Sequence, residues 1–265
     1  MECRTFPANG PWNYARYVDE TQLGAQSGSV LVLTKGFLKG ATVDDLSQLK
    51  ERGNIICADP IDDPVRDELL DCVDVYIAAS MTQFIHYSKQ YADKLVHLIT
   101  HHSDPRLNGI KGPDDRCRIG YFGEIANARY FNELRGTIDF CLVDTTTANA
   151  TWIPKLRECN VHYALRKTRR IDGFKPFLKG FTAASCRSNI IVTRDESDAR
   201  YYLGSDYPFI LKDDSLNAVL EMIEHASSFA GAEWRRGLEI MESVRQRCDP
   251  TQIASQLKSL LARCR

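Results

Sequence analysis

Short apolar runs alternate with segments of helical spacing through the first hundred residues. The first run, residues 29–34 (SVLVLT), has the length of a strand that is buried on both faces, which is typical of a parallel sheet. A helix follows it, because residues 42–45 (TVDD) form a capping box with Asp in place of Glu and Gly53 ends the helical spacing. Further strands are expected at 54–58, 73–78 and 95–100, and further helices at 65–70 and 83–91.

The same alternation restarts after residues 106–117 (RLNGIKGPDDRC). Two glycines, a proline and mixed charge without an apolar period predict that this segment links two domains. Two successive series of strands and helices predict two doubly wound α/β domains that face one another. In the second series we expect strands at 118–122, 138–143, 161–165, 189–193 and 208–211, and helices at 126–134, 152–158, 179–186, 197–203, 215–226, 232–246 and 250–264.

Composition narrows the class of protein. Hydrophobic residues make up 43% of the 265 residues and charged residues 26%, which is the balance of a globular protein with a core. No apolar stretch approaches the roughly 20 residues that span a bilayer, and the first ten residues lack the apolar segment of an export signal. The nine cysteines include no C-x-x-C pair, which favours reduced thiols over a zinc site or a disulfide framework. We therefore expect a cytoplasmic protein without a membrane span.

Charge is distributed unevenly along the chain. The net charge of -1 argues against bulk nucleic-acid binding. Residues 1–117, however, carry 12 Lys and Arg against 17 Asp and Glu, whereas residues 118–265 carry 22 against 18. This asymmetry predicts two domains with different ligands.

The strongest chemical signal is the basic loop at residues 166–180 (RKTRRIDGFKPFLKG). Six cations and two glycines follow a predicted strand and precede a predicted helix. Mobile backbone, positive charge and a helix N-terminus are what a diphosphate requires, and ligands of doubly wound sheets bind beyond the carboxyl ends of the strands. The alternative is a solvated basic loop. Residues 193–199 (TRDESDA) also follow a strand, and their carboxylates either accept from sugar hydroxyls or offset the dipole of the next helix.

Carboxylates and histidines supply candidate bases in the first half. Asp59, Asp62 and Asp63 follow a predicted buried strand and could hold a general base or a divalent cation, although such residues also end strands and cap helices. Adjacent His101 and His102 project to different sides, so at most one of them reaches a shared site. The sequence has no G-x-G-x-x-G, no G-x-x-x-x-G-K-[ST] and no G-x-S-x-G, which argues against common dinucleotide, P-loop and hydrolase sites.

Several segments match, in order, the motifs of one enzyme family. Residues 98–107 (LITHHSDPRL) are similar to an N-G-V-D segment that enters a donor domain, and residues 119–123 (IGYFG) follow it. Residues 182–193 (TAASCRSNIIVT) are similar to E-A-M-A-C-G-x-P-V-I-A-T. Residues 10–16 (GPWNYAR) are similar to a glycine-containing first loop, and residues 59–63 (DPIDD) to a D-x-D-D segment. Together these segments resemble the GT-B glycosyltransferases of family 4.

This resemblance implies an α/β fold of two doubly wound Rossmann-like domains facing a cleft. We expect residues 1–108 to form a reduced acceptor-side domain, residues 117–245 to form the donor-binding domain, and the C-terminal helix, 246–265, to cross back over the linker. The implied function is transfer of a sugar from a nucleotide-diphosphate-sugar donor to a hydroxyl acceptor, in the synthesis of a surface polysaccharide or glycoconjugate. In GT-B enzymes a basic cluster stands in for a metal, so no metal and no other cofactor is implied.

The resemblance also assigns roles to residues. One of Asp59, Asp62 and His102 is implied as the base, and Gly123 lets the backbone approach the donor phosphates. The implied diphosphate ligands are Arg166, Lys167, Lys175 and Lys179.

The chain departs from the family at the usual Glu-x7-Glu pair, where Phe174 and Thr182 stand instead. The implied ribose and sugar contacts then come from Thr182, Asp195, Glu196 and Asp198. Two alternatives stay open: a non-catalytic nucleotide-sugar-binding or scaffold protein with a GT-B-like fold that kept the donor domain and reduced the acceptor domain, and an oxidoreductase with an unusual cofactor loop.

Overall fold

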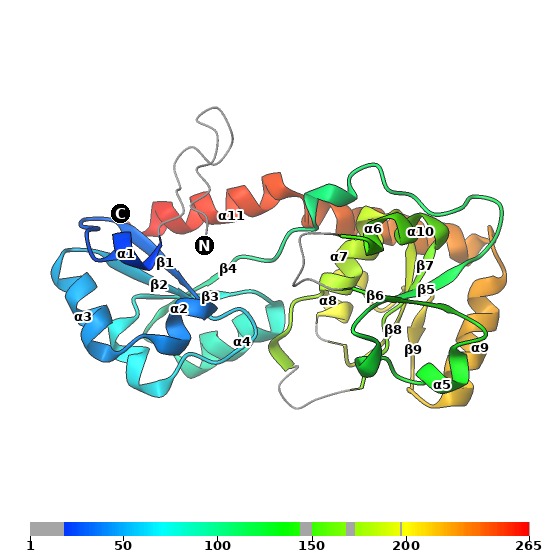
Figure 1. Cartoon of the computed structure of the whole chain (residues 1–265), viewed down its shortest axis with the longest axis horizontal. Helices are drawn as coiled ribbons and strands as arrows, with labels where there is room; N and C mark the ends of the chain where they lie inside the picture. The colour runs from blue at the N-terminus through cyan, green and yellow to red at the C-terminus, as the bar shows by residue number, and fades with distance from the viewer. Residues whose placement is uncertain (1–18, 144–149, 168–172, 197, 265) are drawn as a thin grey trace. The chain divides into compact units, whose positions relative to one another are not determined.

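The computed structural model describes residues 19–143, 150–167, 173–196 and 198–264 (Figure 1). The glycine-containing loop at 10–16, the threonines at 145–147 and residues 168–172 of the basic loop lie outside the described residues. The chain forms two compact units. Unit 1 comprises Met1–His101, Ile171–Pro176 and Pro250–Arg265, and unit 2 comprises His102–Arg170 and Phe177–Asp249.

Unit 1 is built on a four-stranded parallel sheet. Its strands follow one another in sequence order, β1-β2-β3-β4, and β1 and β2 are in register from Val30 opposite Ile55 to Thr34 opposite Asp59. The strands are β1 (Val30–Thr34), β2 (Ile55–Asp59), β3 (Val75–Ala78) and β4 (Leu95–Leu98). The helices are α1 (Glu20–Leu23), α2 (Lys35–Gly40), α3 (Val43–Glu51), the 3-10 helix η1 (Asp67–Cys72), α4 (Met81–Gln90) and α11 (Pro250–Arg263).

The two faces of this sheet are covered by different parts of the chain. Because β-α-β crossovers are right-handed, a sheet in sequence order receives all its connecting helices on one face. Leu31, Ile56 and Tyr76 accordingly pack with residues of α2, α3 and α4. The opposite face presents Cys57, and it is covered by Leu260 of α11, which lies across the sheet from α3 and α4 (Figure 1). The last helix therefore completes the core of the first unit.

Unit 2 holds a five-stranded parallel sheet whose order reverses. Its order is β6-β5-β7-β8-β9, so the chain moves to one side of β5 and then returns to the other. The strands are β5 (Ile119–Gly123), β6 (Asp139–Leu142), β7 (Val161–Tyr163), β8 (Asn189–Thr193) and β9 (Ile210–Leu211). The helices are η2 (Pro105–Leu107), η3 (Ile125–Asn127), α5 (Phe131–Leu134), α6 (Trp152–Lys155), η4 (Leu156–Glu158), α7 (Leu178–Ser185), α8 (Ala199–Leu203), α9 (Leu216–Ser227) and α10 (Ala232–Arg247).

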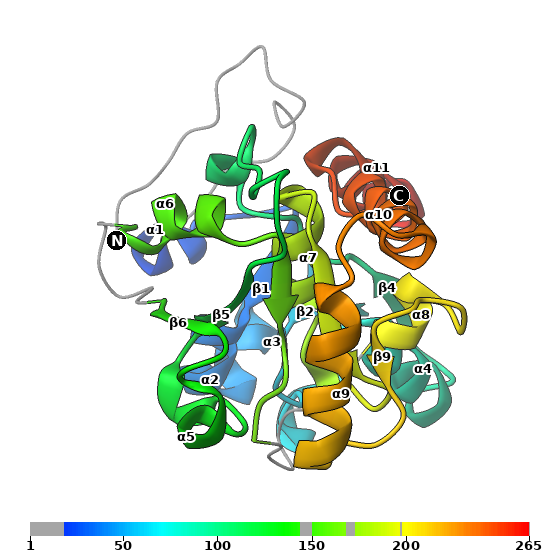
Figure 2. The same ribbon diagram turned by 90° about the vertical axis from the view of Figure 1, so that its right-hand side faces the viewer.

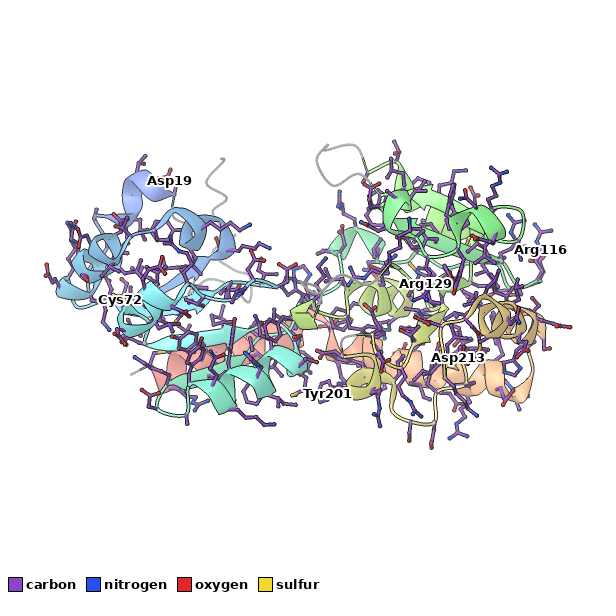
Figure 3. All side chains as sticks on the ribbon, turned by 90° about the horizontal axis from the view of Figure 1, so that it is seen from below. Asp19, Cys72, Arg116, Arg129, Tyr201 and Asp213 are labelled. Atoms are coloured by element: carbon purple, nitrogen blue, oxygen red, sulfur yellow. The ribbon has the colours of Figure 1, made fainter. Side chains whose placement is uncertain are left out.

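Helices α7 and α10 pack against each other in unit 2 (Figure 2). A β-carbon on Gly237 of α10 would lie 2.3 Å from the amide oxygen of Asn189, so only glycine allows this helix to approach β8 so closely. The buried side chains of each unit form separate apolar clusters. Figure 3 shows the described side chains, with Cys72 in the cluster of unit 1.

Three segments differ from the sequence expectations. The helix expected at 126–134 is divided into η3 and α5, because Tyr130 adopts a left-handed conformation with φ of 58° between them. The helix expected at 65–70 is the 3-10 helix η1, displaced by two residues. Helix α2 begins directly after β1, where no helix start signal was evident, and its N-cap makes no side-chain hydrogen bond.

The segment expected to be a linker packs onto unit 2. Leu107 and Ile110 are buried with Phe122 and Leu156, and a β-carbon on Gly112 would lie 2.1 Å from the carbonyl oxygen of Cys159. The segment therefore contributes to the core beneath β5.

Two further findings concern the described residues as a whole. The eight described cysteines are free thiols. No helix in the described ranges is both long enough and apolar enough to cross a membrane.

Replacing Leu260 by Ala tests the role of α11. Leu260 is fully buried against β2 and β3, so its truncation should destabilise unit 1 by about 2–5 kcal/mol. Hydrogen exchange of the β1–β4 amides should accelerate, whereas the β5–β9 amides should keep their rates. The exposed neighbour Ser259 provides the control S259A. Equal acceleration in both sheets would contradict this role.

Candidate functional site

Four of the sequence-predicted residues meet at the carboxyl edge of the second sheet. Gly123 ends β5, Arg166 follows β7, and Glu196 follows β8. Lys179 lies in the first turn of α7, the helix that follows β7. This edge lies where the strand order reverses across β5, which is the position at which doubly wound sheets bind their ligands.

The ammonium group of Lys179 is held against the end of β5. Its Nζ donates to the carbonyl oxygen of Phe122 at 2.9 Å and lies 3.8 Å from the centre of the Tyr121 ring. A β-carbon on Gly123 would come within 3.1 Å of the same nitrogen. The glycine therefore leaves the space into which the lysine extends.

Positive charge is concentrated around this ammonium group. Arg166 lies nearby and forms an ion pair with Glu196, with 3.7 Å between nitrogen and oxygen. Helix α7 points its positive end here and has no acidic residue in its first turn. Within the described ranges, no carboxylate oxygen lies within 4 Å of Lys179 Nζ. Burial, reinforced by the charge of Arg166, consequently lowers the pKa of Lys179 to about 7, although Glu196 opposes the shift.

The groups beneath Lys179 are neutral near pH 7. His162 on β7 is buried, and its ring lies 5.0 Å from that of Phe122 between ring centres. Burial, with a smaller effect of Lys179, lowers the pKa of His162 to about 3, and its Nε2 has no hydrogen-bond partner. Burial raises the pKa of Tyr121 to about 12, and its hydroxyl donates to the carbonyl oxygen of Glu124 at 3.0 Å. Neither ring offers Lys179 a negative charge.

The remaining donor-side candidates lie in other surroundings. Lys167 is exposed and donates to the carbonyl oxygen of Ala126 at 3.0 Å. Thr182 lies one turn beyond Lys179 on α7, and Asp195 is exposed in the turn after β8. Asp198 is 7% exposed and precedes α8 with φ of 61°.

Lys175 belongs to the segment grouped with unit 1. Its neighbour Phe174 packs there against α4, with its ring centre 4.9 Å from that of His86 and 6.0 Å from that of Tyr87. The structure thus brings Gly123, Arg166, Lys179 and Glu196 together within unit 2, whereas Lys175 belongs to unit 1.

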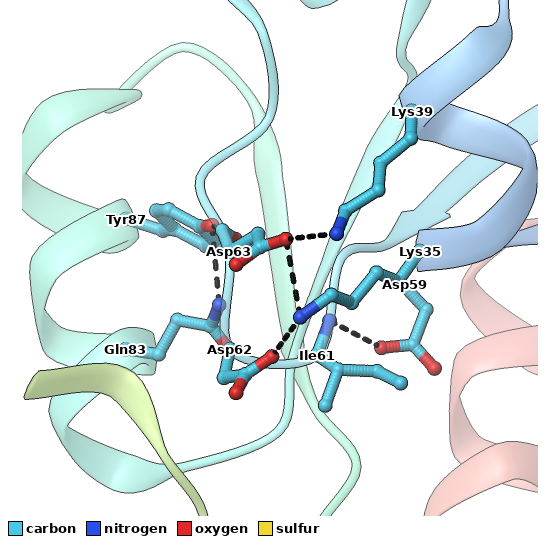
Figure 4. Close-up of polar contacts among 8 residues, drawn as sticks. All are labelled: Lys35, Lys39, Asp59, Ile61, Asp62, Asp63, Gln83 and Tyr87. Carbon is cyan, nitrogen blue, oxygen red and sulfur yellow. Dashed lines mark hydrogen bonds and ion pairs between the residues drawn. The ribbon is translucent and has the colours of Figure 1, made fainter. Parts of the chain in front are cut away.

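A second cluster of charged residues lies at the carboxyl edge of the sheet in unit 1 (Figure 4). Lys35, directly after β1, contacts Asp62 at 2.5 Å and Asp63 at 3.1 Å, and Lys39 contacts Asp63 at 3.3 Å. The hydrogen bond from Lys35 to Asp62 raises the pKa of the lysine. Burial opposes the effect at Asp63, but hydrogen bonds from both lysines hold the pKa of that carboxyl below its usual value. Asp62 is therefore neutralised by a cation.

Asp59 stands apart from these ion pairs. Its carboxylate accepts one hydrogen bond, from the amide of Ile61 at 3.3 Å, and it points away from Asp62 (Figure 4). Burial raises the pKa of Asp59 to about 6, against the smaller effect of that hydrogen bond. Ile61 has φ of 61°, which is costly for a β-branched residue. This strained turn separates Asp59 from Asp62 and leaves Asp59 able to exchange a proton near neutral pH.

Uncharged side chains fix the loop that carries these carboxylates. The hydroxyl of Tyr87 donates to the carbonyl oxygen of Asp63 at 3.2 Å and accepts from the side-chain amide of Gln83 at 3.1 Å. Gln83 in turn accepts from the amide of Ala79 at 2.7 Å. Helix α4 therefore holds the loop through buried hydrogen bonds.

The third candidate base, His102, belongs to unit 2 and is exposed, with Nδ1 2.5 Å from the carbonyl oxygen of Ser103. Among the residues that the structure describes, no three His, Cys, Asp or Glu side chains lie close enough together to hold a metal ion.

Sequence reasoning missed the partners of the predicted residues. Lys35 was detectable in principle, because Thr34 pairs with Asp59 across parallel strands and the next residue reaches the same edge. Tyr121 and the carbonyl group of Phe122 carried no signal, since an aromatic residue in a strand normally indicates core packing.

Stability as a function of pH tests the burial of Lys179. The pKa of about 7 lies below the ordinary value of 10.5, so between these values the unfolded chain binds more protons than the folded protein. The free energy of unfolding attributable to Lys179 should therefore rise with pH across this window. Urea unfolding measures the free energy of unfolding of the wild type and of Lys179→Met. The wild-type value minus the variant value should increase as the pH rises from 7 to 10. A difference that is constant from pH 7 to pH 10 would contradict the assigned burial.

Comparison with known proteins locates the fold among sugar transferases. No protein family model matches the sequence, and no curated protein matches it. Solved structures do match: the GtfA/B complex has a TM-score of 0.63 at 10% identity, covering 92% of this chain and 58% of that chain. A glycosyltransferase from Rickettsia africae has a TM-score of 0.61 at 8% identity, covering 88% and 76%.

Anabaena HepE in complex with UDP has a TM-score of 0.59 at 12% identity, covering 91% of this chain and 80% of that chain. The present chain thus spans less than two thirds of the GtfA/B chain and a larger share of the other two. At 8–12% identity, what this chain shares with these structures is the fold. The chain therefore has an α/β fold of two Rossmann-like units of the GT-B type.

Proposed function

We propose that unit 2 binds a nucleotide-diphosphate-sugar donor and that the protein transfers the sugar to a hydroxyl acceptor. The observation that carries this proposal is the ammonium group of Lys179, which is partly buried beside Arg166 and has no carboxylate oxygen within 4 Å among the residues that the structure describes. A buried cation without a counter-charge is costly, and a diphosphate would supply that charge. The occurrence of UDP in HepE, which has a similar fold, supports the choice of ligand.

In this proposal the diphosphate lies at the carboxyl edge of β5 and β7. Lys179 and Arg166 each donate to phosphate oxygens, and Gly123 allows the phosphates to approach the backbone. Glu196, already beside Arg166, orients the guanidinium and accepts from a sugar or ribose hydroxyl. Lys167, Lys175, Thr182, Asp195 and Asp198 complete the proposed donor contacts.

The leaving nucleoside diphosphate gains negative charge as the sugar departs. Cations held in a partly buried site stabilise that charge more strongly than they would in water. The two cations thus do the work that a metal ion does in other transferases, and the proposed reaction is metal-independent.

The proton of the acceptor hydroxyl requires a base, and Asp59 is the carboxylate that fits this role. Its pKa is raised to about 6 and no ion pair holds it among the described residues, whereas Asp62 is paired with Lys35. A base with a pKa near the working pH is both deprotonated and able to take a proton. His102 remains the alternative base.

The same proposal includes four further statements. The protein belongs to family 4, its acceptor is a saccharide or glycoconjugate, it acts in surface glycan synthesis, and it is located in the cytoplasm.

A second candidate function is binding of a nucleotide sugar without transfer. Thr182 stands where the resembling enzymes have their second Glu, and Phe174, at the first position, packs against His86 and Tyr87. Both positions have an uncharged side chain where those enzymes have a carboxylate. Donor binding without hydrolysis or transfer on any acceptor would favour this candidate.

Calorimetry with donor sugars tests the phosphate ligands. Arg166→Gln and Lys179→Met should each weaken binding of the tightest among UDP-glucose, ADP-glucose and GDP-mannose by about 1–3 kcal/mol, because each loses a charge-assisted hydrogen bond. Arg135→Ala removes an exposed cation at the C-cap of α5, which is not one of the proposed donor contacts, and should leave affinity unchanged. Equal affinity in all four proteins would remove the basis of the donor site.

The pH profile of transfer tests Asp59. The rate should fall as pH drops below about 6, because the base becomes protonated, and Asp59→Asn should lower kcat by about 100-fold or more. Asp67→Asn changes an exposed carboxylate of η1 and serves as the control. An acid limb that persists in Asp59→Asn would assign the base to another residue.

A further inference from the structure

The proposed function does not say whether Lys179 carries its proton in the free protein. An ammonium group has three N–H donors. The single hydrogen bond found for it among the described residues goes to the carbonyl oxygen of Phe122, and the Tyr121 ring covers another side at 3.8 Å. Lys179 is partly buried, and burial of a cation with few acceptors favours loss of its proton.

Among the described residues, the charged and titratable groups around Lys179 supply one negative charge, that of Glu196, which favours the ammonium form and is paired with Arg166. From β5, Tyr121 is a neutral phenol whose hydroxyl donates to the carbonyl oxygen of Glu124. From β7, His162 is a buried neutral ring. Arg166, after β7, repels a second cation, and the carboxylate of Glu196 is 3.7 Å from that guanidinium.

The free site and the occupied site therefore favour different protonation states. Without a ligand, partial burial and the charge of Arg166 favour the neutral amine, and they outweigh the carbonyl oxygen of Phe122 and the face of the Tyr121 ring, which favour the ammonium form. A diphosphate beside the same nitrogen would supply acceptor oxygens and negative charge, which stabilise the ammonium form. Binding and protonation are then linked, since each favours the other.

We propose that the protein binds its diphosphate donor together with one proton, which Lys179 receives. Lys179 is thus an amine in the free protein above neutral pH and an ammonium ion in the complex. This inference rests on the proposed donor site and adds that donor binding is regulated by pH. Donor affinity is highest in mildly acidic to neutral solution, and it falls by about tenfold per pH unit above neutral pH.

Calorimetry in buffers of different ionisation enthalpy measures the proton directly. The probe is the tightest-binding member of UDP-glucose, ADP-glucose and GDP-mannose, because a sugar diphosphate diester lacks the terminal phosphate that titrates near neutrality in UDP. At pH 8 the observed enthalpy should vary with buffer enthalpy with a slope of about one proton taken up, and at pH 6 the slope should be close to zero.

Lys179→Arg is the matched variant, because arginine stays charged at every pH used. It should bind the donor with no proton uptake at pH 8.

Lysine acylation gives a second measurement, which needs neither a ligand nor a variant, because only a neutral amine reacts with the reagent. The pH midpoint of acetylation by an N-hydroxysuccinimide ester, followed by peptide mass spectrometry, should lie near 7 for Lys179. Exposed Lys155, whose pKa is raised by its hydrogen bond to Glu158, is the internal control and should react only at far higher pH.

The outcomes separate this inference from the proposed function. Donor binding without proton exchange at pH 8, or uptake that persists in Lys179→Arg, overturns the inference and leaves the donor site in place. Absence of binding by all three sugars overturns both. An acylation midpoint for Lys179 that matches that of Lys155 overturns the inference by itself.

Discussion

One electrostatic constraint underlies the donor site: two basic side chains and the positive end of α7 converge on the carboxyl edge of β5 and β7, where the described residues supply one carboxylate, that of Glu196. Lys179 and Arg166 share this edge, and Glu196 balances only one of them. The imbalance arises from topology, because the reversal of strand order at β5 brings segments far apart in the sequence to one place. An anion would relieve the imbalance, which is why a diphosphate fits the site.

The two units carry complementary electrostatics. In unit 1, lysines neutralise Asp62 and Asp63, and the strained turn at Ile61 leaves Asp59 outside these pairs with a raised pKa. In unit 2, a carboxylate neutralises one cation and leaves another outside the pair. Asp59 in unit 1 and Lys179 in unit 2 thus each have a pKa shifted toward neutrality, to about 6 and about 7.

The fold was predictable from the sequence to the extent that local patterns determine it. Short apolar runs located the strands, and the capping box of α3 is present with both of its hydrogen bonds. The division of the helix at Tyr130 was not predictable, because its left-handed conformation depends on tertiary contacts such as the hydrogen bond from its hydroxyl to the carbonyl oxygen of Asp214. Likewise, Leu260 packs in the core of unit 1 because the last helix, α11, belongs to unit 1 although it follows the whole of unit 2 in the sequence. No local sequence pattern encodes that assignment.

The sequence predicted the residue types of the candidate site, but it did not predict which groups contact those residues. The basic loop contained both Arg166 and Lys179, but its charge gave no reason to separate them from Lys175, which is grouped with unit 1. A crystal structure of the protein with a nucleoside diphosphate sugar tests the central claim most directly. The account predicts phosphate oxygens within hydrogen-bond distance of Lys179 Nζ and the Arg166 guanidinium. A diphosphate bound elsewhere, with Lys179 still donating only to Phe122, would contradict it.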